Sequence, residues 1–573
     1  MLLEFEGRAR LYRGPVEVVE ARRPDEVAPA LERLRGRDAA GFVAYEAGHA
    51  LEPKLAPLAV EAGGDGPPLL WFGLFDGWED IDPAALLPDP AGAWAGRPRP
   101  RIERSAHEAA VERALEHILA GDIYQANLTF RAEVATAGHP LALYAAIRPR
   151  ARAGWGGVVF TGRHWLLSFS PELFFTLEGG LATARPMKGT APARSDPEAL
   201  RNDPKQRAEN LMIVDLLRND LSRLSKPGTV KVPALFEVET YPTVLQMTST
   251  VTGRLEEGRD AVDLLGTIFP CGSVTGAPKI RAMEIISDLE GEQRGPYTGS
   301  IGRLAPDGRA EFNVAIRTLV LGEGERIARL GLGSGIVADS VAADEWRECL
   351  AKGEFVATAG RFDLIETMRF DPREGIAELD RHLTRMKRSA EALGFGFDRH
   401  HARNELQAAT FFLREGRMLR LLLSSSGALA IESRPLPEAP GSPVEVALAA
   451  LPVESEDFRL RHKTSDRRFY DEAREATRAF EVMFVDPVGF LTEGSFTSLF
   501  VERGGRLLTP PLERGLLPGV LREVLIDEGR AEEADLRVED LEGGFFLGNA
   551  VRGLVPAVLV LPAREARGEG DHA

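Results

Sequence analysis

Cysteine is almost absent from this sequence, and long apolar runs are missing altogether. Only Cys271 and Cys349 occur among 573 residues, which excludes a disulfide framework and a cysteine-rich zinc site. No apolar run approaches the ~20 residues that a membrane-spanning helix requires. The first residues carry acids where a secretory signal carries bases. We therefore expect a cytoplasmic protein with no membrane partner.

Positive charge is also in short supply, because 70 basic residues stand against 87 acidic ones and give a net charge of −17. Nucleic-acid binding needs clustered positive charge, so we expect no nucleic-acid partner. The hydrophobic share of 44% and the charged share of 27% are ordinary for a folded chain. At ~100–200 residues per domain, the length predicts about three to five domains or subdomains.

Lysine is the scarce basic residue, with nine lysines against 61 arginines. Arginine stays protonated in proteins and cannot serve as a nucleophile or bond an aldehyde. A lysine that stands inside a motif is therefore expected to be needed for its amine.

The pattern of apolar residues predicts an α+β protein in several parts. From about 155 to 340, short apolar runs alternate with amphipathic stretches. A helix is predicted from Ser105, with Glu108 completing a capping box and Gly121 ending it, and another from Leu379 to Leu393, ended by Gly394. The expected parts are 1–100, 101–355, 361–563 and a polar tail over 564–573, with a Pro/Gly/Arg-rich linker over 88–101.

Four segments carry chemistry in the first part: SPEL at 170–173 with RPMKGT at 185–190; AENLMIVDLLRND at 208–220; FPCGSVTGAPK at 269–279; and NVAIRT at 313–318 with GSGIVADS at 333–340. Glu345 and Glu348 lie one turn apart on a predicted helix, and Glu209 begins another. Carboxylates from two helices suit Mg²⁺, which binds one or two of them plus substrate oxygens. Spacing alone favours a solvated helix face over a metal site.

Taken together, these segments resemble the chorismate-utilising enzymes, which include anthranilate, isochorismate, salicylate and aminodeoxychorismate synthases. The resemblance covers about 105–353 and is most specific at GSVTGAPKIRAMEII; residues 1–90 resemble the N-terminal subdomain of that family. It implies an antiparallel α/β sandwich with chorismate at its centre. It implies Mg²⁺ on Glu209 and Glu348 with Glu345 nearby, and Glu172 as general acid/base. The residues implied around the substrate are Thr275, Tyr297, Arg317, Gly335 and Lys352.

Lys188 selects among the members of this family. Anthranilate synthases resemble this stretch but have Ala there, whereas aminodeoxychorismate synthases have Lys, which implies a covalent route. A buried amine beside another cation has a lowered pKa and becomes a nucleophile. Two positions depart from the family: Gln246 replaces a frequent His, and Cys271 replaces Gly and is interpreted as a packing residue. Neither cysteine lies in a glutaminase-type turn, so ammonia must come from a separate glutaminase or from solution.

A second constellation lies in the last third of the chain. It comprises His382-Leu383-Thr384-Arg385, His462-Lys463-Thr464-Ser465, Leu491-Thr492-Glu493-Gly494-Ser495 and Gly515 to Arg522. An aldehyde coenzyme such as pyridoxal phosphate (PLP) needs a lysine, an anion cradle and an acidic partner for its ring nitrogen. Lys463, Arg385 with a helix start near Gly519, and Glu493 would supply these. Taken singly, each feature is more often structural than functional: Lys463 as a surface lysine, the turn at Gly519 as a helix cap, and Glu493 as a surface carboxylate.

In order and spacing, they resemble the class IV aminotransferase family over about 361–563, and most closely 4-amino-4-deoxychorismate lyase. The resemblance implies a two-subdomain fold in which Lys463 holds PLP and moves protons. It places Arg385, Gly519 and Val520 at the phosphate, Glu493 at the ring and Thr367 near the coenzyme. Asn549 stands where a hydroxyl residue often binds phosphate, and Ser498 replaces a usual Asn.

Joining the two resemblances predicts a bifunctional enzyme that converts chorismate to 4-aminobenzoate for folate synthesis. The motifs separate lyase from transaminase poorly, so a synthase joined to a true transaminase stays open. A third alternative is that one module is inactive and serves as a docking platform for a glutaminase. Because related PLP enzymes dimerise, we expect a homodimer through the C-terminal part.

Overall fold

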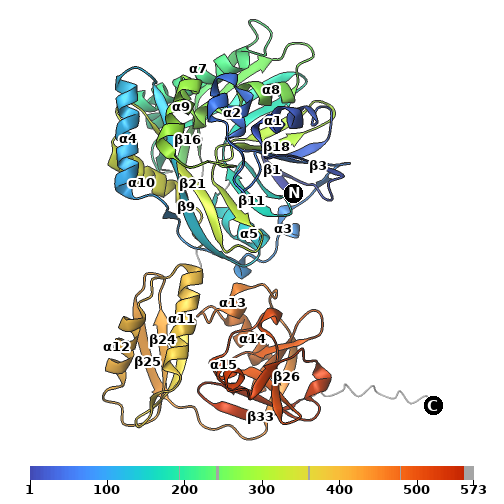
Figure 1. Ribbon diagram of the computed structural model, residues 1–573, viewed down its shortest axis with the longest axis vertical. Coiled ribbons are helices and arrows are strands. Elements are labelled where there is room, and N and C mark those ends of the chain that lie inside the picture. Colours follow the sequence, from blue (N-terminus) through green and yellow to red (C-terminus); the bar gives the residue numbers. More distant parts are fainter. Residues whose placement is uncertain (152, 193, 241–243, 359–361, 478, 561–573) are drawn as a thin grey trace, which may run out of the picture. The chain divides into compact units, whose positions relative to one another are not determined.

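A computed structural model of the chain describes residues 1–151, 153–192, 194–240, 244–358, 362–477 and 479–560. The chain divides into two compact units (Figure 1). Unit 1 contains Met1–Asp89, Ala95–Ala135 and Tyr144–Thr358, and unit 2 contains Pro90–Trp94, Thr136–Leu143 and Ala359–Ala573. The expected start at 361 and the expected tail over 564–573 lie outside the described residues.

Two antiparallel sheets form the centre of unit 1. The first has 11 strands: β17 (Gly276–Ala277), β9 (Gln125–Ala137), β21 (Ile327–Ile336), β20 (Thr318–Gly322), β11 (His164–Ser170), β10 (Trp155–Phe160), β1 (Leu2–Phe5), β2 (Arg8–Leu11) and β6 (Glu79–Asp80) in that order, with β7 (Trp94–Ala95) and β8 (Arg99–Pro100) beside β9. The second has 10: β14 (Met187–Pro192), β16 (Val244–Arg254), β13 (Leu181–Arg185), β12 (Leu173–Glu178), β19 (Ala310–Asn313), β18 (Ser300–Leu304), β4 (Ala39–Val43), β5 (Leu70–Leu74) and β3 (Glu17–Ala21), with β15 (Lys231–Thr240) beside β16.

Helices cover the outer face of each sheet. The helices of this part are α1 (Pro24–Glu32), α2 (Ala47–Leu51), α3 (Pro83–Leu86), α4 (Arg104–Leu119), α5 (Pro140–Ala151), α6 (Pro197–Asn202), α7 (Pro204–Ser222), α8 (Ala261–Ile268), α9 (Lys279–Glu290) and α10 (Ala342–Gly353). One core joins α1, α7 and α8 to the second sheet, and smaller cores join α4 and α9 to the first. A further core mixes residues of both sheets, such as Val159 and Phe42, so the sheets pack face to face. The predicted antiparallel α/β sandwich is confirmed.

Unit 2 has two subdomains, as predicted. The smaller has a four-stranded antiparallel sheet in the order β23 (Gly375–Ile376), β22 (Leu364–Asp371), β24 (Arg417–Leu423) and β25 (Leu429–Pro435), with helices α11 (Leu379–Leu393) and α12 (Arg399–Thr410). The larger has an eight-stranded mixed sheet: β28 (Leu491–Gly494), β27 (Glu481–Val485), β26 (Val444–Ala450), β33 (Gly553–Leu559), β32 (Phe545–Asn549), β29 (Ser498–Arg503), β30 (Arg506–Thr509) and β31 (Ala531–Glu533), with helices α13 (Phe458–Arg461), α14 (Arg468–Thr477) and α15 (Val520–Asp527).

Local signals predicted one helix well and another only in part. Helix α11 spans the expected residues and ends where Gly394 takes a left-handed conformation with φ of 70°. Helix α4 was expected to begin with a Ser105 capping box, but it begins one residue earlier, after Glu103, without a side-chain cap. Leu119, the last residue of α4, is exposed. Within the described ranges, no helix is both long and apolar enough to cross a membrane.

Candidate active sites

A cavity of about 570 Å³ in unit 1 brings together residues from many separate segments of the sequence. We call it the N-terminal cavity. Strand β14 contributes Lys188, helix α7 contributes Glu209, and strand β21 contributes Gly335. The other predicted site residues that line it are Glu172, Tyr297, Arg317, Glu345, Glu348 and Lys352. Residues that lie far apart in the sequence therefore share one chamber because two sheets and two helices converge on it.

Lys188 lies among carboxylates but is bonded tightly to none of them. Its Nζ is 3.9 Å from Oε2 of Glu209, and its side chain is 19% exposed. Burial lowers the pKa of Lys188, and the charge of Lys352 lowers it further, while Glu209 and Glu348 oppose the shift. The amine is thus held closer to its neutral, nucleophilic form than an exposed lysine is.

Glu172 is a buried acid that faces the same cavity. It is 4% exposed, and its Oε1 has no hydrogen-bond partner among the described residues. Burial raises the pKa of Glu172 to about 7, although a hydrogen bond with Ser273 and the charge of Lys188 act in the opposite direction. A carboxyl group with this pKa can hold a proton near neutrality and give it to a leaving group.

The predicted metal ligands are carboxylates of two different environments. Burial raises the pKa of Glu209. Glu348 is 54% exposed and lies 2.7 Å from Nζ of Lys352; burial opposes its ionisation, but Lys352 and Lys188 together lower its pKa. Nowhere in the described ranges do three or more His, Cys, Asp or Glu gather closely enough to hold a metal. Glu345 therefore does not complete a three-residue site, whereas two carboxylates suit Mg²⁺ when the substrate supplies further oxygens.

Two residues near this cavity differ from the sequence-based picture. Thr275 is fully buried and does not line the cavity; its hydroxyl donates to the carbonyl oxygens of Cys271 and Gly272. Gln125, which the sequence did not single out, is fully buried, and neither polar atom of its amide has a partner among the residues described. Cys271 is 3% exposed and belongs to the core, and burial raises its pKa to about 12. Its interpretation as a packing residue is consistent with this position.

Gly335 fixes how closely these groups approach one another. A Cβ atom at residue 335 would lie 2.6 Å from Nζ of Lys188 and 3.1 Å from Nε2 of Gln125. The lysine amine and the Gln125 amide therefore both lie beside residue 335, which has no room for a side chain. The Gly-Ser-Gly motif was visible in the sequence, but this crowding around residue 335 depends on packing.

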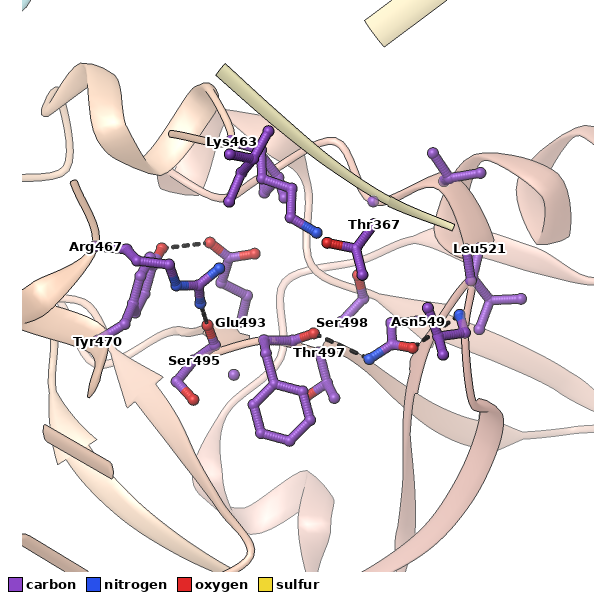
Figure 2. Close-up of a pocket in the computed structure, with 18 of the residues that line it drawn as sticks. Thr367, Lys463, Arg467, Tyr470, Glu493, Ser495, Thr497, Ser498, Leu521 and Asn549 are labelled. Carbon is purple, nitrogen blue, oxygen red and sulfur yellow. Dashed lines mark hydrogen bonds between the residues drawn. The ribbon is translucent and has the colours of Figure 1, made fainter. Parts of the chain in front are cut away.

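A second cavity of about 530 Å³ lies in unit 2, between its two subdomains, and we call it the C-terminal cavity. Figure 2 shows Lys463 and Thr367 pointing toward one another in this cavity, with Glu493 to one side of them, next to Tyr470. All the predicted coenzyme residues line it: Thr367, Arg385, Lys463, Glu493, Gly519, Val520 and Asn549.

Lys463 stands where its amine is desolvated. Its main chain is tied to the start of β22, because the amide of Ile365 donates to its carbonyl at 2.8 Å. Burial lowers the pKa of Lys463 to about 7, and the neighbouring charges of Arg385, Arg467 and Arg420 add to the shift. A neutral amine at this position is able to bond an aldehyde.

Glu493 is a buried carboxyl group opposite the lysine. The hydroxyl of Tyr470 donates to its Oε1 at 2.6 Å (Figure 2). Burial raises the pKa of Glu493 to about 7. Such a group can share a proton with a heterocyclic nitrogen, which fits the acidic partner that PLP requires.

The other end of the C-terminal cavity is shaped for an anion. Helix α15 starts there after Gly519, and a Cβ at residue 519 would lie 2.5 Å from the Ser498 hydroxyl. Free backbone N–H groups at a helix start favour phosphate. Asn549 is engaged in its own turn, where its Oδ1 accepts from the amides of Val551 and Arg552. The lysine, the buried acid and this helix start together fit PLP.

Arg385, predicted at the phosphate, is also half of a buried ion pair. Its Nε and Nη2 donate to the two oxygens of Glu366 at 2.9 and 2.6 Å, and its Nη1 donates to the carbonyl of Pro518. Nδ1 of His382 lies 2.6 Å from the same carboxylate. The sequence did not reveal Glu366, which anchors the arginine beside the start of α15.

Two family models match the chain, one after the other. Residues 12–358 match the family model described as chorismate binding enzyme. The chain belongs to the chorismate-binding enzyme family. Residues 363–560 match the model of amino-transferase class IV, so the chain joins both kinds of domain.

Two curated relatives are each similar to less than half of this chain. Anthranilate synthase component 1 of Streptomyces coelicolor is 45% identical over 264 residues, which are 44% of this chain and 50% of that protein. Aminodeoxychorismate synthase component 1 of Klebsiella aerogenes is 41% identical over 261 residues, 44% of this chain and 57% of that protein. The chain thus spans about half the length of the curated relatives it matches.

Two solved structures are each similar to part of the chain. Anthranilate synthase component I from Streptococcus pneumoniae matches with 27% identity and a TM-score of 0.54, over 61% of this chain and 92% of that one. A putative amino-acid aminotransferase from Mesorhizobium loti is 41% identical over 35% of this chain and all of its own, with a TM-score of 0.33.

Proposed function

We propose that the chain is a bifunctional enzyme that aminates chorismate and then converts the product, aminodeoxychorismate, to 4-aminobenzoate and pyruvate. One observation carries the proposal: each unit has a cavity with a buried lysine of lowered pKa, Lys188 in the first and Lys463 in the second. The relatives named aminodeoxychorismate synthase component 1 support the first activity. The second is proposed because its substrate is the product of the first.

In the N-terminal cavity, the neutral amine of Lys188 attacks C2 of chorismate. Glu172 protonates the hydroxyl that leaves C4, so the new C–N bond forms as the C–O bond breaks. Ammonia then bonds C4 and displaces the lysine. Glu209 and Glu348 would hold Mg²⁺, and the metal would supply positive charge against the substrate carboxylate. Tyr297, Arg317, Gly335 and Lys352 surround the substrate.

In the C-terminal cavity, Lys463 is the residue that holds PLP and then accepts the proton from C4 of the substrate. When bound, PLP supplies an electron sink for the carbon that loses this proton. Glu493 would keep a positive charge on the coenzyme ring, and Arg385 and the start of α15 would hold the phosphate. Pyruvate leaves from C3, and the ring becomes aromatic.

The amination needs a source of ammonia. We propose that a separate glutamine amidotransferase supplies the ammonia, and that free ammonia in solution can replace it. We also propose that the chain forms a homodimer through unit 2, which sedimentation analysis tests.

Product analysis tests the proposal directly. The full chain is incubated with chorismate, ammonium, Mg²⁺ and PLP, and 4-aminobenzoate and pyruvate are expected in equal amounts. Lys463→Ala is expected to accumulate aminodeoxychorismate, and Lys188→Ala to stop the amination. Accumulation of aminodeoxychorismate by the unaltered chain would instead identify the second unit as a transaminase or an inactive platform, and formation of anthranilate would identify the first as an anthranilate synthase.

A further inference from the structure

The C-terminal cavity carries more positive charge than its coenzyme residues account for. Its lining includes six arginines and Lys463 but only two carboxylates, Asp471 and Glu493. PLP brings one anionic group, and the residues at the start of α15 are placed for it. The remaining arginines therefore need either a protein partner or a second anion.

Most of these arginines have partners within the chain. Arg385 is paired with Glu366, Arg459 with Asp457, and Arg474 with Asp471. Arg467 and Arg552 donate to the main-chain carbonyls of Ser495 and Glu438. These five side chains are therefore already held in place by groups of the protein.

Arg420 is different. No ion pair of Arg420 occurs in the part of the chain that the structure describes, and its Nε is buried without a hydrogen-bond partner. Glu432 stands opposite it in the register of β25 but is bound by Arg434 at 2.7 Å. A desolvated guanidinium N–H without an acceptor costs free energy, which a bound carboxylate would offset.

The position of Arg420 places it beside the reacting groups. It pairs in register with Thr367 of β22, so both side chains stand on the sheet face that lines the cavity. Its charge is also one of those that lower the pKa of Lys463. An anion held by Arg420 would thus lie close to the lysine that acts on the substrate.

We infer that Arg420 binds a substrate carboxylate, the one on the enolpyruvyl group that departs as pyruvate. The inference rests on the proposed lyase function, whose substrate carries two carboxylates. Lys463 has to reach C4, and the enolpyruvyl group is attached to the adjacent C3, whereas the ring carboxylate lies across the ring on C1. A planar guanidinium matches a carboxylate with two parallel hydrogen bonds and fixes the direction in which the leaving group departs.

The experiment compares Arg420→Met and Arg420→Lys with the unaltered full chain loaded with PLP. For aminodeoxychorismate, Arg420→Met is expected to raise KM about 10- to 100-fold, since a charge-assisted hydrogen-bonded pair is lost, with a smaller effect for Arg420→Lys. The coenzyme absorbance is expected to stay unchanged, and so is the PLP affinity measured well above the pKa of Lys463, where the amine is neutral with or without the charge of Arg420. Arg417→Met is the matched control, because Arg417 lies on the same strand and does not line the cavity.

Binding of pyruvate to the PLP-loaded chain supplies a readout that needs no turnover. It is expected to weaken at least 10-fold in Arg420→Met. If the unaltered chain forms no 4-aminobenzoate from aminodeoxychorismate, the proposed lyase function fails. If it does, but KM and pyruvate affinity are the same in Arg420→Met, or PLP affinity falls in parallel, the role of Arg420 is wrong.

Discussion

Gly335 and the amine of Lys188 are in such close contact that any side chain at residue 335 would collide with the amine, since a Cβ there would lie 2.6 Å from Nζ. Gly335→Ala is therefore expected to displace Lys188 from its place beside Glu209. Displacement of a reacting group by about 1 Å costs on the order of 100-fold in rate, so the amination of chorismate should fall by at least that factor. Steady-state formation of aminodeoxychorismate measures this.

Gly266→Ala is the matched control, because a Cβ at this helical glycine meets nothing within 4 Å. It should leave amination unchanged. Conversion of added aminodeoxychorismate to 4-aminobenzoate should survive in both variants, since unit 2 carries that cavity. Full amination by Gly335→Ala would contradict the assigned position of the nucleophile.

The sequence motifs predicted which residues meet in the N-terminal cavity, because each motif is local and the family resemblance joins them. They did not predict Gln125. Its amide stands out because it is buried without a hydrogen-bond partner among the described residues, and this depends on tertiary packing. They placed Thr275 at the substrate, whereas its hydroxyl is used to hold the backbone of the 271–275 turn. Glu366 was missed for a similar reason: its role comes from Arg385 and His382 on another element.

The raised pKa of Glu172 predicts how amination depends on pH. Since this pKa is about 7, the carboxyl group is protonated below pH 7 and loses its proton above it. At a constant concentration of neutral ammonia, and at pH values where Lys188 is already neutral, kcat should fall about tenfold per pH unit above the midpoint. Glu172→Gln keeps the size but has no acidic proton, so it should be ~100- to 10,000-fold slower and show no such midpoint.

The lowered pKa of Lys463 predicts when the chain without coenzyme can bond PLP. With a pKa of about 7 instead of 10.5, the amine is mostly neutral above pH 7. The rate of PLP attachment, followed by absorbance and by borohydride trapping, should therefore rise with pH to a plateau with a midpoint near 7. Lys387→Ala, which removes an exposed lysine of α11, should leave this profile unchanged. A rate that still climbs above pH 9 would count against a desolvated Lys463.

The buried pair of Arg385 and Glu366 should govern the stability of unit 2. Arg385 and His382 outweigh the effect of burial and lower the pKa of Glu366 to about 2. Because this folded-state pKa lies below the ordinary 4.5, the pair stabilises the fold above pH 4.5, and this stabilisation is lost as the pH falls through 2. Glu366→Ala leaves a buried charge unpaired and is expected to cost about 3–5 kcal/mol at neutral pH, measured by denaturant unfolding of the full chain. Glu391→Ala removes an exposed partner of Lys387 and should leave the unfolding transition in place. If the two variants unfold alike, the pair of Arg385 and Glu366 does not govern the stability of unit 2.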